Sequence, residues 1–240
     1  MAGVVRQDRK PSPLLIEHEN LDDKIYARLK RMIAEGELSP GQRILQEKLA
    51  RDMGVSRTPL VNALKRLAQE RLVEWVSRRG IYVKRFSMWE MAQLFEVREG
   101  LEPIAARLAA ARIAPAEVRK FRQMFDGFSK RPSAAEVQRY LKCDRQFHWR
   151  LVELTENPHL AAAMESVNIM ISAYQVGVPR SLAESLPEHQ AIIEALGRRD
   201  PEASEAAMRV HIRRSVERLW QRARSEEGES SARGVLPATR

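Results

Sequence analysis

Apolar residues recur every three to four positions through most of this chain, a period typical of amphipathic helices. A first stretch of this kind follows Asn20, a residue suited to capping a helix. The segment GELSPG then interrupts the pattern, and a short second helix follows that ends at Gly54. The inward positions predicted for these two helices are Ile25, Leu29, Met32 and Ile33, and then Leu45, Leu49 and Met53.

A third helix begins directly afterwards, within the stretch SRTPLVNALKRL. Ser56 favours the N-cap position, and Pro59 falls in the first turn, where its missing N–H costs little. The apolar side consists of Leu60, Ala63, Leu64 and Leu67, and the outward side carries Arg57, Thr58, Val61, Asn62 and Lys65. Two helices joined by so tight a turn predict a helix-turn-helix.

Two β-rich runs, at 72–76 and 81–85, follow these helices and flank the turn SRRG. That order predicts a winged helix-turn-helix, whose third helix enters the DNA major groove by its N-terminal end. Arg78 and Arg79 at the hairpin tip suit phosphate groups or a narrow minor groove, and Gly80 permits a tight turn. A winged helix used only for protein contacts is the alternative, but it leaves the basic tip unexplained.

From Ser87 onward the strand signals stop and only helical periodicity remains. Six helices are predicted, over residues 88–112, 115–130, 133–156, 158–176, 181–198 and 201–224, with prolines near their boundaries. The predicted fold class is mainly α, with an N-terminal winged helix-turn-helix domain at 20–86 and an all-α helical bundle at 87–224. Residues 1–19 are expected to form a flexible tail, and residues 225–240 a disordered one.

The net charge of +9 over 240 residues is unevenly distributed. Residues 1–86 carry 18 Lys and Arg against 11 Asp and Glu, whereas residues 87–240 are nearly neutral. A basic N-terminal region is typical of a protein that binds a polyanion such as DNA. Cys143 is the only cysteine, no apolar run approaches the ~20 residues of a membrane helix, and no secretory signal is recognisable. We therefore expect a cytoplasmic protein without a membrane partner.

Polar side chains occupy several bundle positions where core residues are expected. Asp144 and His148 are four residues apart on the inward side of the third bundle helix, so they share one face. His189 and His211 occupy inward positions on the fifth and sixth bundle helices. A lone inward histidine is more often a satisfied core residue, but three histidines and an aspartate that converge could bind one divalent metal ion. Zinc is favoured, with nickel, copper, iron and manganese as alternatives.

Arg98 lies between Leu94 and Leu101 on the inward side of the first bundle helix. A guanidinium group that faces a bundle interior requires an anion. Glu102, one turn later, would provide that anion in a structural salt bridge, and a small carboxylate ligand would provide it in a binding site. The sequence alone does not decide between these two alternatives.

These segments together resemble the GntR family of bacterial transcriptional regulators, and within it the FCD (FadR-like) branch. The N-terminal part of the resemblance rests on GELSPGQRILQEKLARDMGVSRTPLVNAL and on RLVEWVSRRGIYV. The C-terminal part rests on LFEVREGLEPIAARLAA, DRQFHWRLVELTENPHL, EHQAIIEAL and AAMRVH, in the family's order. The resemblance implies a homodimer that binds double-stranded operator DNA and responds to a small effector, typically an organic acid or a sugar acid.

The resemblance also implies roles for particular residues. The family's metal ligands, one Asp and three His, match Asp144, His148, His189 and His211. Arg98 matches the arginine that often engages the carboxylate of the effector. The DNA-binding residues expected from the winged domain are Ser56, Arg57, Thr58, Val61, Asn62, Lys65, Arg78, Arg79 and Gly80. Six bundle helices resemble the VanR-type subgroup.

This chain departs from the family pattern at Val61 and Asn62, where many relatives carry Arg-Glu. The arginine of that pair commonly reaches DNA. A valine can contact a thymine methyl group and an asparagine can pair with adenine, but neither replaces an arginine that reads guanine. We therefore expect an operator that differs from the family's usual one.

Two other functions use the same residues. A metal-dependent hydrolase with an accessory DNA-binding domain would use the cluster to activate water. However, no further inward Glu or His is an obvious general base, so we expect no enzymatic activity. An architectural DNA-binding protein with a purely structural metal would have no effector at all.

Overall fold

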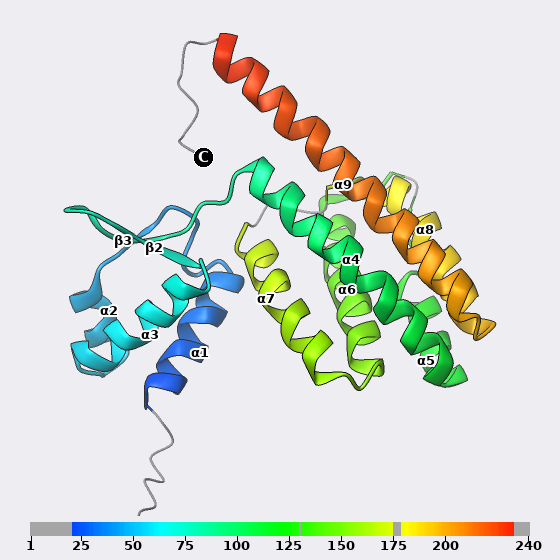
Figure 1. Ribbon diagram of the computed structural model, residues 1–240, viewed down its shortest axis with the longest axis horizontal. Helices are drawn as coiled ribbons and strands as arrows, with labels where there is room; N and C mark the ends of the chain where they lie inside the picture. Colours follow the sequence, from blue (N-terminus) through cyan, green and yellow to red (C-terminus); the bar gives the residue numbers. More distant parts are fainter. Residues whose placement is uncertain (1–20, 130, 175–178, 233–240) are drawn as a thin grey trace, which may run out of the picture.

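The computed structural model describes residues 21–129, 131–174 and 179–232 of the chain. Within these residues a winged domain is followed by a bundle of longer helices, and the two parts pack side by side (Figure 1). The mainly helical fold class predicted from the sequence is confirmed. The tail expected at 1–19 and the cap expected at Asn20 lie outside the described residues.

The winged domain is built on three helices, α1 (Leu21–Ala34), α2 (Gln46–Asp52) and α3 (Arg57–Gln69). Helix α1 packs along α3 through the apolar sides that the sequence predicts, with Leu29, Leu60 and Leu64 fully buried. Gly54 has a φ of +66°, a left-handed conformation that a glycine adopts without strain, and it separates α2 from α3.

A three-stranded antiparallel sheet completes the winged domain, with the order β1 (Arg43–Ile44), β3 (Gly80–Val83) and β2 (Val73–Val76). The hairpin β2–β3 is the predicted wing, and Trp75 pairs with Ile81 in it. Strand β1 was not predicted, because a strand of two residues carries no periodicity. It is held by pairing with β3, which is a tertiary contact.

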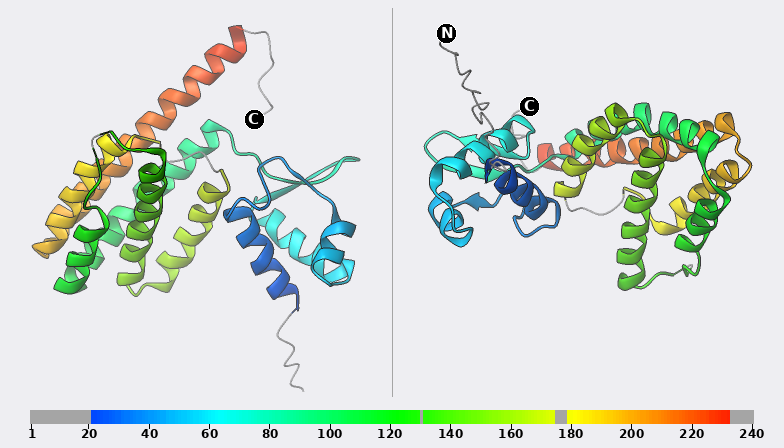
Figure 2. Two further views of the ribbon diagram at one scale, coloured as in Figure 1. Left: turned by 180° about the vertical axis from the view of Figure 1, so that it is seen from behind. Right: turned by 90° about the horizontal axis from the view of Figure 1, so that it is seen from below.

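The bundle consists of α4 (Met88–Arg112), α5 (Pro115–Met124), α6 (Ala134–Leu154), α7 (Pro158–Tyr174), α8 (Leu182–Gly197) and α9 (Pro201–Ala232). Each corresponds to one predicted segment. Three of them begin with a capping box, in which a serine and a glutamate three residues later bond each other's backbone N–H groups. The long helices α4 and α9 lie antiparallel and side by side (Figures 1 and 2).

Three expectations were wrong in detail. Leu45 is 53% exposed instead of inward, because it precedes α2 at the N-cap position. Helix α5 ends at Met124 and not at residue 130, and the chain turns at Gly127 with a φ of +69°. Helix α9 continues to Ala232, past the expected start of a disordered tail at 225. An established helix gains one hydrogen bond for each residue added, so a polar sequence can extend it. Residues 233–240 lie outside the described part.

The two domains share apolar packing and an ionic contact. One hydrophobic cluster runs from the winged domain through Phe86 and Met91 into the bundle. In the ionic contact, Lys30 of α1 lies 3.7 Å from Glu165 of α7 and 3.1 Å from Glu70. The end of α1 therefore rests against α7. Among the described residues, no helix is long and apolar enough to span a membrane.

Candidate functional site

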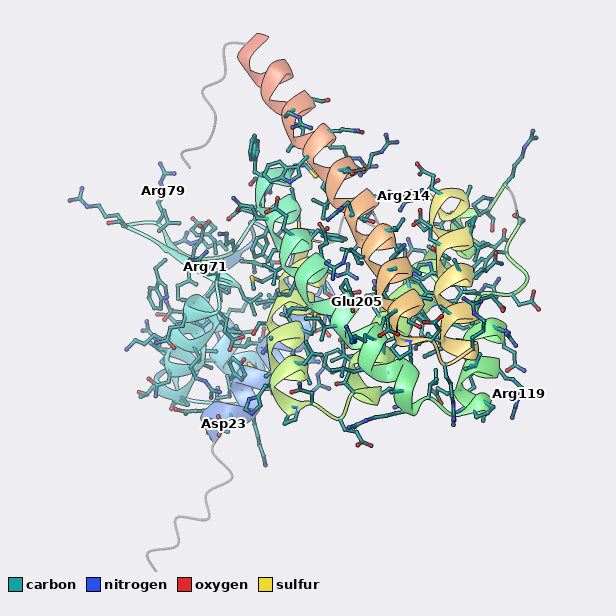
Figure 3. The ribbon with its side chains drawn as sticks, turned by 45° about the vertical axis from the view of Figure 1, so that its right-hand side comes forward. Asp23, Arg71, Arg79, Arg119, Glu205 and Arg214 are labelled. Atoms are coloured by element: carbon teal, nitrogen blue, oxygen red, sulfur yellow. The ribbon has the colours of Figure 1, made fainter. Side chains whose placement is uncertain are left out.

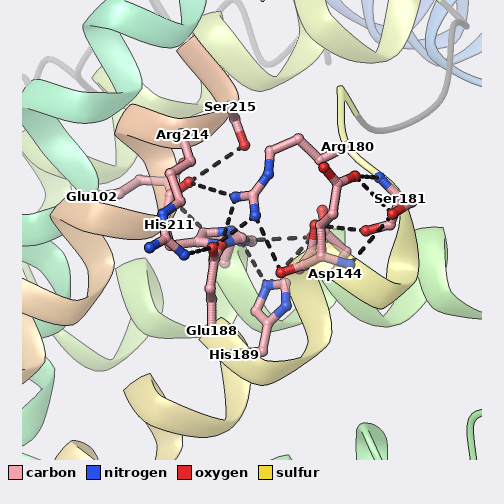
Figure 4. Close-up of polar contacts among 12 residues, drawn as sticks. Glu102, Asp144, Arg180, Ser181, Glu188, His189, His211, Arg214 and Ser215 are labelled. Carbon is pink, nitrogen blue, oxygen red and sulfur yellow. Dashed lines mark hydrogen bonds and ion pairs between the residues drawn. The ribbon is translucent and has the colours of Figure 1, made fainter. Parts of the chain in front are cut away.

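Asp144, His148, His189 and His211 come together although they lie on three helices. Figure 4 shows Asp144, His189 and His211 of this cluster. Helix α6 supplies Asp144 and His148 one turn apart, α8 supplies His189 and α9 supplies His211. One candidate ligand atom from each side chain lies within 4.8 Å of the other three. His189 Nε2 is 3.2 Å from His148 Nε2 and 3.4 Å from Asp144 Oδ1. The structure thus brings together all four predicted ligands in a buried position.

Each histidine of the cluster uses its Nδ1 atom on a buried partner outside the cluster. Such a partner orients the imidazole ring and determines which nitrogen carries the proton. With Nδ1 engaged in this way, the Nε2 side of each ring faces the centre of the cluster. The pairs are His148 with Glu102, His189 with the Tyr140 hydroxyl at 2.9 Å, and His211 with Glu188 Oε2 at 2.9 Å.

The protonation of the cluster suits metal binding. Burial lowers the pKa of His189 well below its usual value, and the neighbouring His211 and His148 lower it further. Burial also lowers the pKa of His211, although its hydrogen bond to Glu188 opposes this effect. His189 and His211 are therefore neutral near pH 7, which is the form that binds a metal ion.

Two arginines keep Glu188 ionised. The Nη atoms of Arg180 lie 2.6 and 2.7 Å from its two carboxylate oxygens, and Arg214 Nη1 lies 2.5 Å from Oε1. Burial by itself would raise the pKa of Glu188, but hydrogen bonds from His211, Arg180 and Arg214 outweigh it and lower this pKa to about 2. The carboxylate thus remains an acceptor that holds His211 in place.

Glu102 is also ionised at neutral pH. Burial would raise its pKa, but the charge of Arg98 and the hydrogen bonds with His148 and Arg98 outweigh burial and hold the pKa below its usual range. Three imidazole nitrogens and one carboxylate oxygen, with ionised or polar groups behind them, form a donor set that fits zinc. The same set accepts nickel, iron or manganese. The residues present therefore fit a divalent metal ion.

A cavity of about 850 Å³ opens beside the cluster. Asp144, His148 and His211 line it together with Arg98, so one small molecule can reach the cluster and a guanidinium group at once. Arg98 is buried, and its Nε donates a hydrogen bond to Glu102. The structural salt bridge considered from the sequence is therefore present. No hydrogen bond joins either Nη atom of Arg98 to another described residue, which leaves these donors for a ligand.

Sequence reasoning missed most of the groups that support the cluster. Glu188, Arg180, Arg214 and Tyr140 were not singled out as supporting groups. One signal was available, since Glu188 directly precedes His189 and is itself an acid in an apolar stretch. Its partner Arg180 comes from the segment before α8, and no sequence pattern links the two.

The start of α3 presents a polar surface. Ser56, Arg57 and Thr58 are exposed there, and Arg78 and Arg79 are exposed at the tip of the wing. Figure 3 shows Arg79 projecting from the winged domain, on the side of the molecule away from Arg119. Ser56 occupies the predicted N-cap position of α3, but its hydroxyl makes no capping hydrogen bond within the described chain.

Two of the predicted DNA-binding side chains already have partners within the domain. Asn62 donates a hydrogen bond of 3.0 Å to Asp22 of α1, so the orientation of its amide is set by α1. Arg57 lies 3.4 Å from Glu47. This ion pair is exposed and therefore weak, so another anion can displace Glu47. Lys65 is exposed on the same face, and Val61 is half-buried.

Arg43, on β1 beside the wing, is a further basic residue that the sequence analysis did not indicate. It lies on β1 opposite Tyr82, and a Cβ atom at Gly80 would come within 3.4 Å of its Nε. That distance is an ordinary van der Waals contact, so the glycine at position 80 is explained by the φ of +111° there, which other residues rarely adopt. The pairing of β1 with β3 adds Arg43 to the basic surface of Arg78 and Arg79.

A winged helix-turn-helix followed by a helical domain with a cavity is the arrangement of transcriptional regulators that carry an effector domain. The chain matches the bacterial regulatory proteins of the gntR family over residues 21–83 and the FCD domain over residues 93–214. It belongs to the GntR family and carries an FCD domain.

Individual relatives agree with this assignment. The chain is 31% identical to the Nta operon transcriptional regulator of Aminobacter aminovorans over 182 residues, which cover 75% of this chain and 85% of the relative. It is 27% identical to the uncharacterized HTH-type transcriptional regulator YdhC of Bacillus subtilis (strain 168), covering 88% and 92%. The structure of E. coli McbR/YncC superposes with a TM-score of 0.66 at 19% identity, covering 84% and 98%, and so shares the fold.

Proposed function

We propose that this regulator binds operator DNA as a homodimer and that a small carboxylate metabolite, bound at a metal ion in the bundle, controls this binding. The observation that carries the proposal is the shared cavity, which Asp144, His148, His211 and Arg98 all line. The family assignment supports DNA binding, and the relative RspR of Escherichia coli is described as a transcriptional repressor. We also propose a cytoplasmic location and membership of the VanR-type subgroup, in keeping with the six helices α4–α9 among the described residues.

A carboxylate suits the chemistry of the cavity. A zinc ion held by four protein ligands can accept a further oxygen ligand, and a carboxylate oxygen is a ligand that zinc accepts. The two Nη atoms of Arg98 then provide the bidentate hydrogen bonding that carboxylates favour. The centroid of the Phe95 ring lies 4.6 Å from the Arg98 guanidinium carbon, so the ring packs against that group. One carboxylate group at this position satisfies both the metal and the arginine.

The cavity also reaches the winged domain. Ala34 and Glu35, at the end of α1, line it together with residues of α6 and α7. The end of the first helix of the DNA-binding domain therefore forms one wall of the cavity that a ligand would occupy. Because an operator with two half-sites is sensitive to the spacing of the two recognition helices, a small displacement of α1 is sufficient to change DNA affinity.

The test is an operator-binding experiment on the full-length, zinc-loaded protein. DNA that the protein selects from a random pool serves as the operator, and fluorescence anisotropy reports its affinity. We expect at least one member of a panel of organic and sugar acids to change that affinity by about 5- to 150-fold. Arg98→Gln should abolish the response and leave effector-free DNA binding intact.

Two outcomes would contradict this proposal. If no acid changes either the operator affinity or the melting temperature, the metal is structural and the protein is an architectural DNA-binding protein. If the zinc-loaded protein hydrolyses a substrate and His189→Ala abolishes turnover, the cluster is catalytic.

The homodimer is supported by apolar side chains on the outer face of the bundle. Val97, Ile104 and Leu108 of α4 are 46%, 44% and 38% exposed, and Val210 of the adjacent α9 is 48% exposed. The three α4 residues are spaced by seven and four, so they share one side of the helix. We propose that a second copy of the chain covers this face.

An aspartate at the centre of that face tests the homodimer. Ile104→Asp should raise the dimer dissociation constant by at least about 30-fold, because twofold symmetry places the buried charge in the interface twice. Sedimentation equilibrium measures the change. Leu21→Asp, at a similarly exposed leucine of the winged domain, is the matched control and should leave the dimer intact. Equal dissociation constants for the wild type and Ile104→Asp would place the interface elsewhere.

A further inference from the structure

Three guanidinium groups line the cavity beside the metal cluster, and two of them are neutralised by buried acids. Arg98 is paired with Glu102, and Arg180 is clamped on both oxygens of Glu188. These two arginines hold the outer partners of the histidines, so their charge is largely balanced within the protein.

Arg145 is the third guanidinium group, and it differs from the other two. It directly follows Asp144 on α6 and is exposed toward the cavity. No hydrogen bond or ion pair joins it to any other residue in the described ranges. Gln138 and Leu141, seven and four residues earlier on the same helix, also line the cavity, so Arg145 continues one face of α6.

The acidic side chains that line the cavity leave this charge unbalanced. Asp144 belongs to the metal cluster, and Glu165 lies 3.7 Å from Lys30 of the winged domain. Glu35, at the end of α1, has no ion pair with another described side chain. It makes the wall formed by α1 unfavourable for an anion, whereas the α6 wall with Arg145 is favourable.

We propose that the effector is an acid with two anionic groups, most simply a dicarboxylate, and that Arg145 binds the second group. This inference rests on the proposed function, in which the first carboxylate lies at the metal ion and Arg98. Asn168 and Ser172 of α7 line the same cavity and provide neutral hydrogen-bonding groups. An acid with a single carboxylate leaves Arg145 without a partner and gains less binding energy.

Matched pairs of acids test this inference on the full-length, zinc-loaded protein. Isothermal titration calorimetry compares each dicarboxylate with the monocarboxylate of equal carbon number. The pairs are succinate with butyrate, glutarate with pentanoate, and adipate with hexanoate. We expect the best dicarboxylate to bind at least about tenfold more tightly than its monocarboxylate partner, a difference of about 1.4 kcal/mol. Arg145→Gln should remove this preference and leave monocarboxylate binding within about twofold of the wild type.

Two variants serve as controls. Lys142→Gln removes the same charge from an exposed position of α6 that does not line the cavity, and it should keep the preference for dicarboxylates. Arg145→Lys retains the charge without the bidentate geometry and should keep part of the preference. Together, the two variants distinguish a direct contact of Arg145 with the second carboxylate from a general effect of one positive charge on α6.

Several results would overturn the inference. Monocarboxylates that bind the wild type as tightly as dicarboxylates would show that Arg145 does not contribute, although the proposed function would still stand. A change in effector-free DNA affinity in Arg145→Gln, with selectivity unchanged, would indicate an interdomain contact with Glu35 instead. If neither class of acid binds and Arg98→Gln changes nothing, the proposed function fails together with the inference.

Discussion

Replacing His189 by alanine is expected to lower the zinc affinity of the protein by more than about 100-fold. His189 is fully buried, and its Nε2 faces both His148 and Asp144 at the centre of the cluster. Loss of a group that merely orients a ligand costs 10- to 100-fold in metal affinity, so loss of the ligand itself costs more. Competition with a fluorescent zinc chelator measures this change.

The melting temperature provides a second readout. Zinc at a thousand times its dissociation constant stabilises the folded wild type by about 4 kcal/mol. For a chain of this size that corresponds to about 8–16 °C, so a chelator should lower the melting temperature by this amount. In His189→Ala the chelator should have almost no effect. The difference in melting temperature between the metal-free wild type and metal-free His189→Ala gives the cost of the cavity left by the imidazole, separately from the loss of zinc binding.

His159→Ala is the matched control. His159 is exposed near the start of α7, outside the cluster, so the same substitution should change neither zinc affinity nor the response to chelator. If His189→Ala binds zinc as tightly as the wild type, the four side chains are a satisfied polar core. The metal-dependent part of the proposal would then be wrong.

Replacing Arg57 by alanine is expected to weaken specific operator binding by about 2–6 kcal/mol. The residue lies exposed in the first turn of α3, where a recognition helix meets base edges, and its pair with Glu47 is too exposed to hold it. A good bidentate contact with a base contributes about 1–3 kcal/mol, and a dimer makes it once in each half-site. Anisotropy titrations with the selected operator and with a scrambled duplex measure the effect.

Two further arginines make this test specific. Arg79→Ala, at the tip of the wing, should weaken the operator and the scrambled duplex alike and reduce the salt slope by about 1 for each protomer. Arg119→Ala, on α5 in the bundle, removes the same charge far from the winged domain and should change neither (Figure 3). Unchanged operator affinity in Arg57→Ala would refute the assignment of α3 as the recognition helix.

The structure also refines the expectation for the operator. Asn62 is held by Asp22, so its amide is not free to pair with adenine unless that bond opens. Val61 then remains as the half-buried residue on the outward side of α3, and we expect any contact that it makes with DNA to be apolar. This combination favours a thymine methyl group over a guanine at that position of each half-site.

The sequence by itself determined the helices and their order. Capping serines, boundary prolines and a period of 3.6 residues act within a few positions of the chain, so the six bundle segments and the helix-turn-helix were all recognisable. Asp144 and His148 could be placed together for the same reason, because one turn of α6 separates them. The wing was visible because a hairpin is also a local structure.

Only the tertiary structure decided what those helices bring together. The meeting of His189 and His211 with α6 depends on how α8 and α9 pack, which no local pattern encodes. The same is true of the bond between Arg180 and Glu188, of strand β1 and of the pairing of Asn62 with Asp22. Each of these joins segments distant in the sequence or lacking any periodicity, so their geometry follows from the packing of the whole chain and not from the residues nearby.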